Sequence, residues 1–389
     1  MATIGERVVN LRKRRGMSQA ELASVSGVSA SLIRKLEQGS RSDVRLETAR
    51  KIAAALRVPT TAIITDHVGD QADAETVDHW GAVRRALHGL GDHSDEPPTV
   101  EGIRTALDAS MPLWKGDKYA ELATTLPKLL ADTDTLVGAD RSQRFVRARL
   151  LHLTGWLLTQ TRQFEAAELA LLRGLDDADD LLEAAAIVST RCWLLLRQGR
   201  LEQARQLAIK WADDVEPRIS RATPQDLSAW GWLLLRSSAA AVRDNRPGEA
   251  EDAIRLARTA AVAMSRDLSP GDDFLRTFGP ITVAMKRAEN AMVEDRPDLV
   301  LRMSQAIPTN ELAPTSNNRN RHLLDVADAH RRSRQYGEAF DVLRRIRQDS
   351  PEWIVNQGYA KDILKGIFAR RRTLTGDMRD LADFVRLDY

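Results

Sequence analysis

The stretch MSQAELASVSGVSASLIRKLEQG, residues 17–39, decides the architecture of the first part of the chain. Ser18, with Glu21 three residues later, forms a capping-box pattern that predicts a helix beginning just after Ser18. Gly27 suits the positive φ of a sharp turn, and Ser29 suits the cap of a following helix. The stretch therefore predicts two short helices joined by a tight turn.

The apolar residues predict which sides of these two helices face a core. The expected inner side of the first helix consists of Ala20, Leu22, Ala23 and Val25. In the second helix Ile33 and Leu36 are expected to point inward. The exposed side is then made of Ala30, Ser31, Arg34 and Lys35.

Further helices are predicted on both sides of this stretch. Ile4, Val8 and Leu11 recur at helical spacing before it, and RLETARKIAAAL, residues 45–56, follows it. A short helix after Pro59 completes a unit of five helices.

This unit resembles the phage-repressor-like, or XRE, helix-turn-helix family over residues 4–65. The resemblance is carried by Gln19, Ala23, Gly27, Val28, Ser29, Ile33, Glu37 and Gly39. It implies that the third helix enters the major groove of double-stranded DNA and that the start of the second helix holds a phosphate. The implied DNA-binding residues are Arg12, Ser18, Gln19, Ser29, Ala30, Ser31, Arg34, Lys35, Arg41 and Arg45.

Different roles are expected within this set. The resemblance places Gln19 at a phosphate and Arg12, Arg41 and Arg45 along the flanking backbone. The base-reading positions lack the bidentate Gln or Asn of some relatives, so Arg34 and Lys35 are the candidates to reach guanine. Both could instead contact phosphate alone. Direct readout is expected to be thin, with backbone contacts and DNA shape contributing heavily.

Charge and composition fit this interpretation. Residues 1–67 hold 12 Lys/Arg against 6 Asp/Glu, whereas the remainder of the 389 residues is mildly acidic. A basic head on an acidic body is typical of a module that binds a polyanion. The single cysteine, Cys192, excludes a disulfide within the chain and fits a cytoplasmic protein. No apolar run reaches the ~20 residues of a membrane span.

Residues 68–98 are predicted to be an acidic linker with one amphipathic helix. Val77, Trp80, Val83 and Leu87 would share one side of that helix. It could seal the first face of the following domain or join two subunits.

Residues 99–389 are predicted to be a stack of helix pairs. Similar segments recur with turn positions at Tyr119, Phe164, Leu201, Pro247, Pro297 and Tyr336. Small residues are expected where helices approach closely, at Gly155, Cys192, Ala288 and Ala327. The segments resemble tetratricopeptide repeats over about residues 100–350, but their spacings of 37 to 50 exceed the ~34 residues of a regular repeat. The predicted fold is all-α, a five-helix head followed by an irregular right-handed solenoid with a concave surface.

A helix-turn-helix head joined to such repeats resembles the intracellular peptide-pheromone receptors of Gram-positive bacteria. The resemblance implies a homodimer, an inverted-repeat operator and a short peptide bound in the concave groove. The implied effector residues are His152, Trp156, Thr159, Gln160, Trp193, Arg197, Arg236, Lys286, Glu289, Asn290, Asp325 and Asp328. A partner protein or a small molecule is the alternative effector, and the two tryptophans could equally be packing residues.

Enzymatic function is not expected. The seven histidines show no metal-binding spacing such as HExxH, and the sequence holds neither a GxSxG motif nor a phosphate-binding loop. No catalytic residues, metal or cofactor are therefore predicted.

Overall fold

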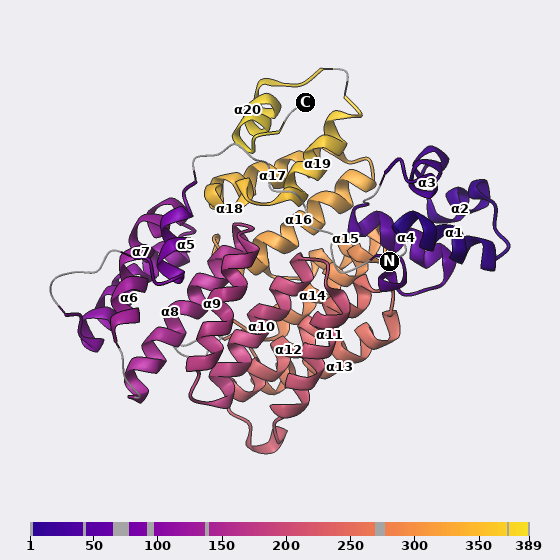
Figure 1. The fold of residues 1–389 in the computed structure, drawn as a ribbon. Helices are drawn as coiled ribbons and strands as arrows, with labels where there is room; N and C mark the ends of the chain where they lie inside the picture. Colours follow the sequence, from indigo (N-terminus) through magenta and orange to yellow (C-terminus); the bar gives the residue numbers. More distant parts are fainter. Residues whose placement is uncertain are drawn as a thin grey trace.

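The structure is a computed structural model that describes residues 3–41, 44–64, 78–91, 97–136, 140–268, 277–371 and 373–387. Within these residues the secondary structure is helical apart from one isolated bridge between Leu268 and Phe278. Figure 1 shows a small head at one side of a large stack of helix pairs. The predicted all-α fold class is confirmed.

The elements follow in chain order. The head consists of α1 (Ile4–Arg14), α2 (Gln19–Ser26), α3 (Ala30–Glu37), α4 (Leu46–Leu56) and the 3₁₀ helix η1 (Thr60–Ala62). After α5 (Gly81–Leu87), the helix pairs are α6 (Val100–Lys115) with α7 (Tyr119–Thr135), α8 (Arg141–Gln160) with α9 (Phe164–Asp177), α10 (Leu181–Arg197) with α11 (Leu201–Asp214), α12 (Pro224–Arg243) with α13 (Pro247–Met264), α14 (Pro280–Val293) with α15 (Pro297–Gln305), and α16 (Asn317–Arg332) with α17 (Tyr336–Asp349). The 3₁₀ helices η2 (Ile219–Arg221) and η3 (Thr309–Glu311) are connectors, and α18 (Pro351–Val355), α19 (Gly358–Phe368) and α20 (Gly376–Phe384) end the described chain.

The local signals of the head fold as predicted. The Ser18 hydroxyl accepts a hydrogen bond from the Glu21 amide at 3.1 Å, and the Ser18 amide donates to the Glu21 carboxylate at 2.7 Å. Gly27 ends α2 with a φ of 66°, and the Ser29 hydroxyl caps α3. The predicted fifth helix is a single 3₁₀ turn.

The inner side of α2 differs from the prediction. Leu22 and Ser26 are buried, whereas Ala20 is exposed and Val25 keeps 63% of its surface exposed. The physical reason is the helix phase, because Leu22 and Ser26 lie four residues apart on the face toward the core. Ser26 is tolerated there because its hydroxyl donates to the Leu22 carbonyl at 2.6 Å.

Every predicted repeat turn lies at the start of the second helix of a pair. Tyr119, Phe164, Leu201, Pro247, Pro297 and Tyr336 are the first residues of α7, α9, α11, α13, α15 and α17. Two residues before each of them the backbone is left-handed, at Asp117, Arg162, Gly199, Asn245, Asp295 and Arg334. Only one of these six is glycine, so this shared turn could not be found by searching for glycines.

The small residues permit close helix approach as expected. A Cβ atom added to Gly155 on α8 would lie 2.5 Å from Cγ of Leu171 on α9. Cys192, Ala288 and Ala327 are completely buried.

The linker helix is α5, and it packs on the repeat stack. Val83 and Leu87 are buried in the same hydrophobic cluster as Leu122 and Leu130 of α7. Val77 and most of the acidic residues expected in this segment lie outside the described residues. The domain boundaries at residues 67 and 98 stay predictions.

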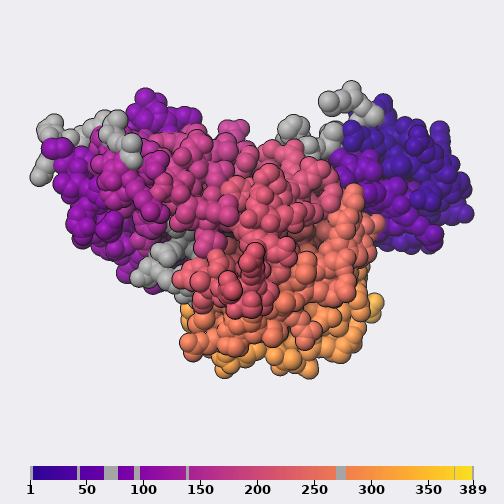
Figure 2. All heavy atoms as spheres, turned by 90° about the horizontal axis from the view of Figure 1, so that it is seen from below, coloured from indigo at the N-terminus to yellow at the C-terminus, as the bar shows by residue number. Residues whose placement is uncertain are grey.

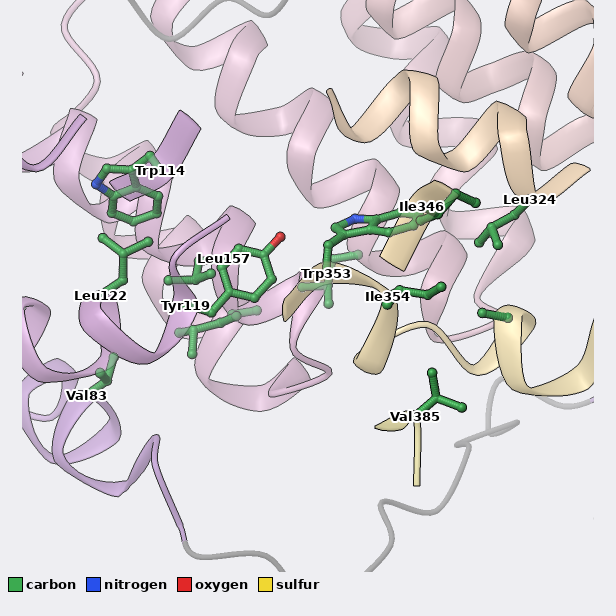
Figure 3. Packing of buried hydrophobic residues seen from close by; sticks show 14 of the residues in the cluster. Val83, Trp114, Tyr119, Leu122, Leu157, Leu324, Ile346, Trp353, Ile354 and Val385 are labelled. Carbon is green, nitrogen blue, oxygen red and sulfur yellow. The ribbon is translucent and has the colours of Figure 1, made fainter. Parts of the chain in front are cut away.

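The repeat stack turns back on itself, which the sequence did not lead us to expect. One hydrophobic cluster runs from Trp114, Tyr119 and Leu157 at the first helix pairs to Leu324 and Trp353 near the end of the chain (Figure 3). Polar contacts join the same parts of the chain. The Ala120 amide donates to the Glu352 carboxylate at 2.8 Å, and the Thr315 hydroxyl donates to the Lys115 carbonyl at 2.6 Å. The helices after α17, predicted only to cap the far end, therefore belong to a seam that joins the two ends.

Replacing Gly231 with alanine is expected to destabilise the middle of the stack. The added Cβ would lie 2.0 Å from Cζ of Phe278, whose ring is completely buried. Overpacking of this kind costs about 1–3 kcal/mol of unfolding free energy. Chemical denaturation followed by tryptophan fluorescence measures the loss, because Trp230 and Trp232 flank the site. Gly248→Ala is the matched control, since no atom lies within 4 Å of its added Cβ.

Candidate DNA-binding surface and effector site

The outer face of α3 is the candidate DNA-reading surface. Ala30, Ser31, Arg34 and Lys35 are all exposed, while Ile33 and Leu36 on the opposite face are completely buried. Ser18 and Ser29 lie at the beginnings of α2 and α3, where each serves as a helix cap. The predicted base-reading positions therefore form one continuous exposed face.

Arg12 and Gln19 share a partner that holds α1, α2 and α3 together. The Arg12 guanidinium donates twice to the Glu37 carboxylate, at 2.7 Å each, and Gln19 donates to the same carboxylate at 2.8 Å. The side chains of Arg12 and Glu37 are only 12% and 4% exposed. Burial alone would raise the pKa of Glu37, but the hydrogen bonds from Arg12 and Gln19 outweigh it and lower this pKa.

This arrangement changes the expected role of Arg12. A guanidinium that is buried against Glu37 and also donates to the Met17 carbonyl at 2.7 Å is positioned to orient α3, not to reach flanking phosphates. Gln19 is half-buried, and the remaining candidates for backbone contacts, Arg41 and Arg45, are exposed.

Arg45 also points to the body. Its guanidinium lies 2.7 Å from the Asp362 carboxylate on α19, although both side chains remain largely open to solvent. An exposed pair of this kind contributes little stability. Arg45 can therefore exchange Asp362 for a phosphate at small cost.

The head docks directly on the turn between α12 and α13. The completely buried Asp244 carboxylate accepts from the Thr61 amide at 2.9 Å and from the Thr61 hydroxyl at 3.0 Å. Thr60 donates its hydroxyl to the Arg243 carbonyl at 2.8 Å and its amide to the Asp244 carbonyl at 3.3 Å. Figure 2 shows the indigo head as a lobe seated against this part of the stack.

A second link joins the head to the inside of the stack. Arg332 on α16 donates to Glu47 of the head at 3.1 Å and to Asp328 at 2.8 Å. Asp328 is buried and also accepts from the Tyr359 hydroxyl at 3.1 Å. One predicted effector residue is thus a single side chain away from the head.

Several predicted effector residues are buried and bonded to other parts of the chain. The neutral ones have partners on neighbouring helices: the His152 ring bonds the Thr190 hydroxyl at 2.7 Å, Gln160 donates to Asn317, and Asn290 donates to the Ser238 hydroxyl at 2.8 Å. The Thr159 hydroxyl donates to the Gly155 carbonyl of its own helix at 2.7 Å. The predicted open groove is therefore filled at these positions by the protein's own contacts, because the stack closes on itself.

The charged members of the predicted effector site form one network. Glu289 lies 2.5 Å from Arg243, 2.9 Å from Lys286 and 3.7 Å from Arg321. Arg321 also pairs with the buried Asp325 at 2.8 Å. Burial by itself would raise the pKa of Glu289, but the three cations together hold it well below its usual range.

The two tryptophans of the predicted site differ in their surroundings. Trp156 packs in a tilted arrangement against Trp114, with ring centroids 6.5 Å apart, so it belongs to the seam. Trp193 is half-buried between two guanidinium groups, 5.8 Å from that of Arg197 and 5.9 Å from that of Arg236. Arg236 in turn donates to the Ser189 carbonyl at 3.1 Å.

Sequence reasoning missed the residues that connect the two sites. Arg243 and Asp244 lie at the turn before α13, and their only sequence signal was the repeat turn "RDNRP" at residues 243–247. Arg321 and Arg332 lie on α16 beside predicted residues, but a lone arginine on a helix gives no signal of its partner. His322 was noted only as lacking a metal motif.

Two surveys of the described residues complete the picture. They contain no group of three or more His, Cys, Asp or Glu side chains arranged to hold a metal ion. None of the helices seen in this part of the chain is long and apolar enough to cross a membrane.

Comparison with known proteins assigns the head. Residues 9–63 match the family model described as helix-turn-helix. Over 59 residues the chain is 37% identical to the uncharacterized HTH-type transcriptional regulator RghRB of Bacillus subtilis and 39% identical to the HTH-type transcriptional repressor RghR of the same organism. The matched residues are 15% of this chain and cover 42% and 44% of those relatives.

A solved structure aligns with more of the chain. The crystal structure of Bacillus thuringiensis PlcR in complex with the peptide PapR7 and DNA matches 79% of this chain and 95% of that chain, at 14% identity and a TM-score of 0.36. Similarity at this level is too low to transfer properties of that complex. The family match and the capped, exposed α3 lead to one conclusion: the chain carries a helix-turn-helix domain of the XRE type in front of an α-helical repeat stack.

Proposed function

We propose that the protein is a transcriptional regulator that binds double-stranded DNA through the outer face of α3. The observation that carries this proposal is the exposed face of Ala30, Ser31, Arg34 and Lys35 within a matched helix-turn-helix domain. The N-terminus of α2, with Ser18 and Gln19, would hold a backbone phosphate. Arg41 and Arg45 would contact the flanking backbone.

We further propose that an effector bound inside the repeat stack modulates operator binding. Two contacts support a direct route from the interior to the head. Glu289 bonds Arg243, whose carbonyl accepts from Thr60, and Asp328 bonds Arg332, which holds Glu47. An effector that displaces either carboxylate would change how the head is seated, without any need to act through the linker.

A short peptide is the proposed effector, and a partner protein or a small molecule is the alternative. Because the interior contacts described above fill the groove, the effector would have to replace some of them. Mass spectrometry of molecules that copurify with the natively expressed protein distinguishes these three classes.

Homodimerisation and an inverted-repeat operator belong to the same proposal. Heads of this type act in pairs on half-sites about one or more helical turns, ~10 bp each, apart. Analytical ultracentrifugation that finds a monomer both free and on DNA would reject this part of the proposal.

Replacing Lys35 or Arg34 with alanine is expected to weaken binding to a selected operator. A side chain that contacts a base should cost about 1–3 kcal/mol and relax specificity at one position. Gln19→Ala should weaken all sequences similarly. The measurement is selection of operator from random DNA, followed by titration of single-base variants with each protein. A uniform loss for Lys35→Ala would show that Lys35 contacts phosphate alone.

A further inference from the structure

The inside of the repeat stack holds more buried positive than negative charge. Lys286, Arg321, Arg243 and Arg236 face one another there, and the two carboxylates among them in the described residues are Glu289 and Asp325. The side chain of Lys286 is 14% exposed and that of Arg321 is 28% exposed. Buried charges are normally paired, so this surplus calls for a further anion.

The two carboxylates are already shared among these cations. Glu289 serves Arg243, Lys286 and Arg321 at the same time, and Asp325 serves Arg321. The neighbouring Asp328 does not reduce the surplus, because it is bonded to Arg331 and Arg332. Lys286 is left with a third of one carboxylate.

His322 supplies the second observation. It is 2% exposed, lies beside Lys286 and Arg321, and neither of its ring nitrogens has a hydrogen-bond partner. Burial and the two nearby cations lower its pKa to about 4, so the ring is neutral near pH 7. A neutral ring can donate one hydrogen bond to an anion without adding to the charge.

We propose that the interior binds its effector through an anionic group, a carboxylate or a phosphate, held by Lys286, Arg321 and His322. This inference rests on the proposed function, since it names the chemistry that the effector must carry. An arriving anion competes with Glu289 for these cations. It thereby acts on Arg243, whose carbonyl holds Thr60 of the head.

The test uses the full chain and inorganic phosphate in a chloride buffer of constant ionic strength. Saturable binding, followed by ³¹P NMR and by a rise in the melting temperature, is expected for the unmodified protein. Lys286→Met should weaken phosphate binding by about tenfold or more, whereas Lys128→Met on the exposed face of α7 should bind as tightly as the unmodified protein.

A separate readout distinguishes a binding site from an ordinary buried ion pair. Without phosphate, Lys286→Met should melt no lower than the unmodified protein, because Glu289 keeps both arginines and the positive surplus is reduced. Lys286→Arg should retain phosphate binding. A large loss of stability in Lys286→Met, with an unchanged response to phosphate in the remaining folded protein, would overturn the proposal.

The source of the anion is tested with a pool of pentapeptides, compared with the same pool amidated at the C-terminus. Preferential binding of the free C-termini would identify the anionic group as a peptide carboxylate, and binding of phosphate alone would identify a free anion. Binding of neither probe, or a response to phosphate that never saturates, would overturn the proposal. Phosphate binding that leaves operator affinity unchanged would keep the anion site and reject the effector role.

Discussion

Replacing Glu37 with methionine is expected to unfold the head while the repeat stack stays folded. The substitution removes the carboxylate that accepts from both Arg12 and Gln19 and leaves the Arg12 guanidinium buried without its counter-charge. Removing one partner of a buried ion pair costs about 3–5 kcal/mol. The head rests on a core of its own, made of 13 buried residues from Ile4 to Ile64, and such a small core has little stability to spare.

The distribution of tryptophan makes this result easy to observe. All eight tryptophans lie between Trp80 and Trp353, so fluorescence reports on the rest of the chain and never on the head. Hydrogen exchange of peptides from residues 3–64 should become fast in Glu37→Met, while the fluorescence melting curve should keep its midpoint. Operator binding should be lost in parallel.

The double variant Arg12→Met with Glu37→Met is the control. It removes both charges and should recover part of the lost protection, because an apolar pair can replace a buried ion pair. If the double variant exchanges as fast as the single one, the ion pair is not the cause.

The pH dependence has a defined sign. The pKa of Glu37 is lower in the folded head than in the unfolded chain, so its contribution is present at pH values above the unfolded pKa of about 4.5. This contribution is lost as the pH falls through the folded pKa. The single variant should lack this acid-dependent component.

Replacing Asp244 with alanine is expected to release the head from the stack. Three hydrogen bonds are lost, from the Thr61 amide, the Thr61 hydroxyl and the Arg246 guanidinium. A hydrogen bond to a charged group contributes about 1.5–3 kcal/mol, and an unsatisfied buried amide adds a penalty. The contacts that remain between head and stack are mostly single hydrogen bonds and exposed ion pairs, so the free head should become populated.

Small-angle scattering should then show a larger radius of gyration, and hydrogen exchange should increase at residues 58–64. Asp244→Asn keeps an acceptor for Thr61 and should retain most of the docking. Asp252→Ala, at an exposed position of α13, should change neither measurement. Scattering that is identical for Asp244→Ala and the unmodified protein would show that docking depends on other contacts.

Local patterns in the sequence were sufficient to predict the head and the helix pairs. Caps such as Ser18 and turn residues such as Gly27 act over three or four positions, so their effect can be read from neighbouring residues. Each repeat turn fell at the start of a helix for the same reason. Val25 was misassigned because an apolar residue on a short helix does not have to be buried.

The seam and the head–body contact could not be predicted. They join Lys115 to Thr315 and Thr61 to Asp244, pairs separated by about 200 residues. No periodicity records such a pairing, because it depends on the accumulated rotation from one helix pair to the next. The candidate interior site was located on the correct helices, but its burial follows from the seam and was missed.

The seam also bears on how the protein unfolds. In an open array each repeat touches only its neighbours, so the ends can fray and the stability is close to a sum of local terms. Here the first and last pairs share one hydrophobic cluster that includes Leu157 and Trp353, so neither end can melt without exposing the other. Residues 97–387 should therefore lose their structure in a single cooperative transition, and folding should be slowed by the need to bring distant segments together.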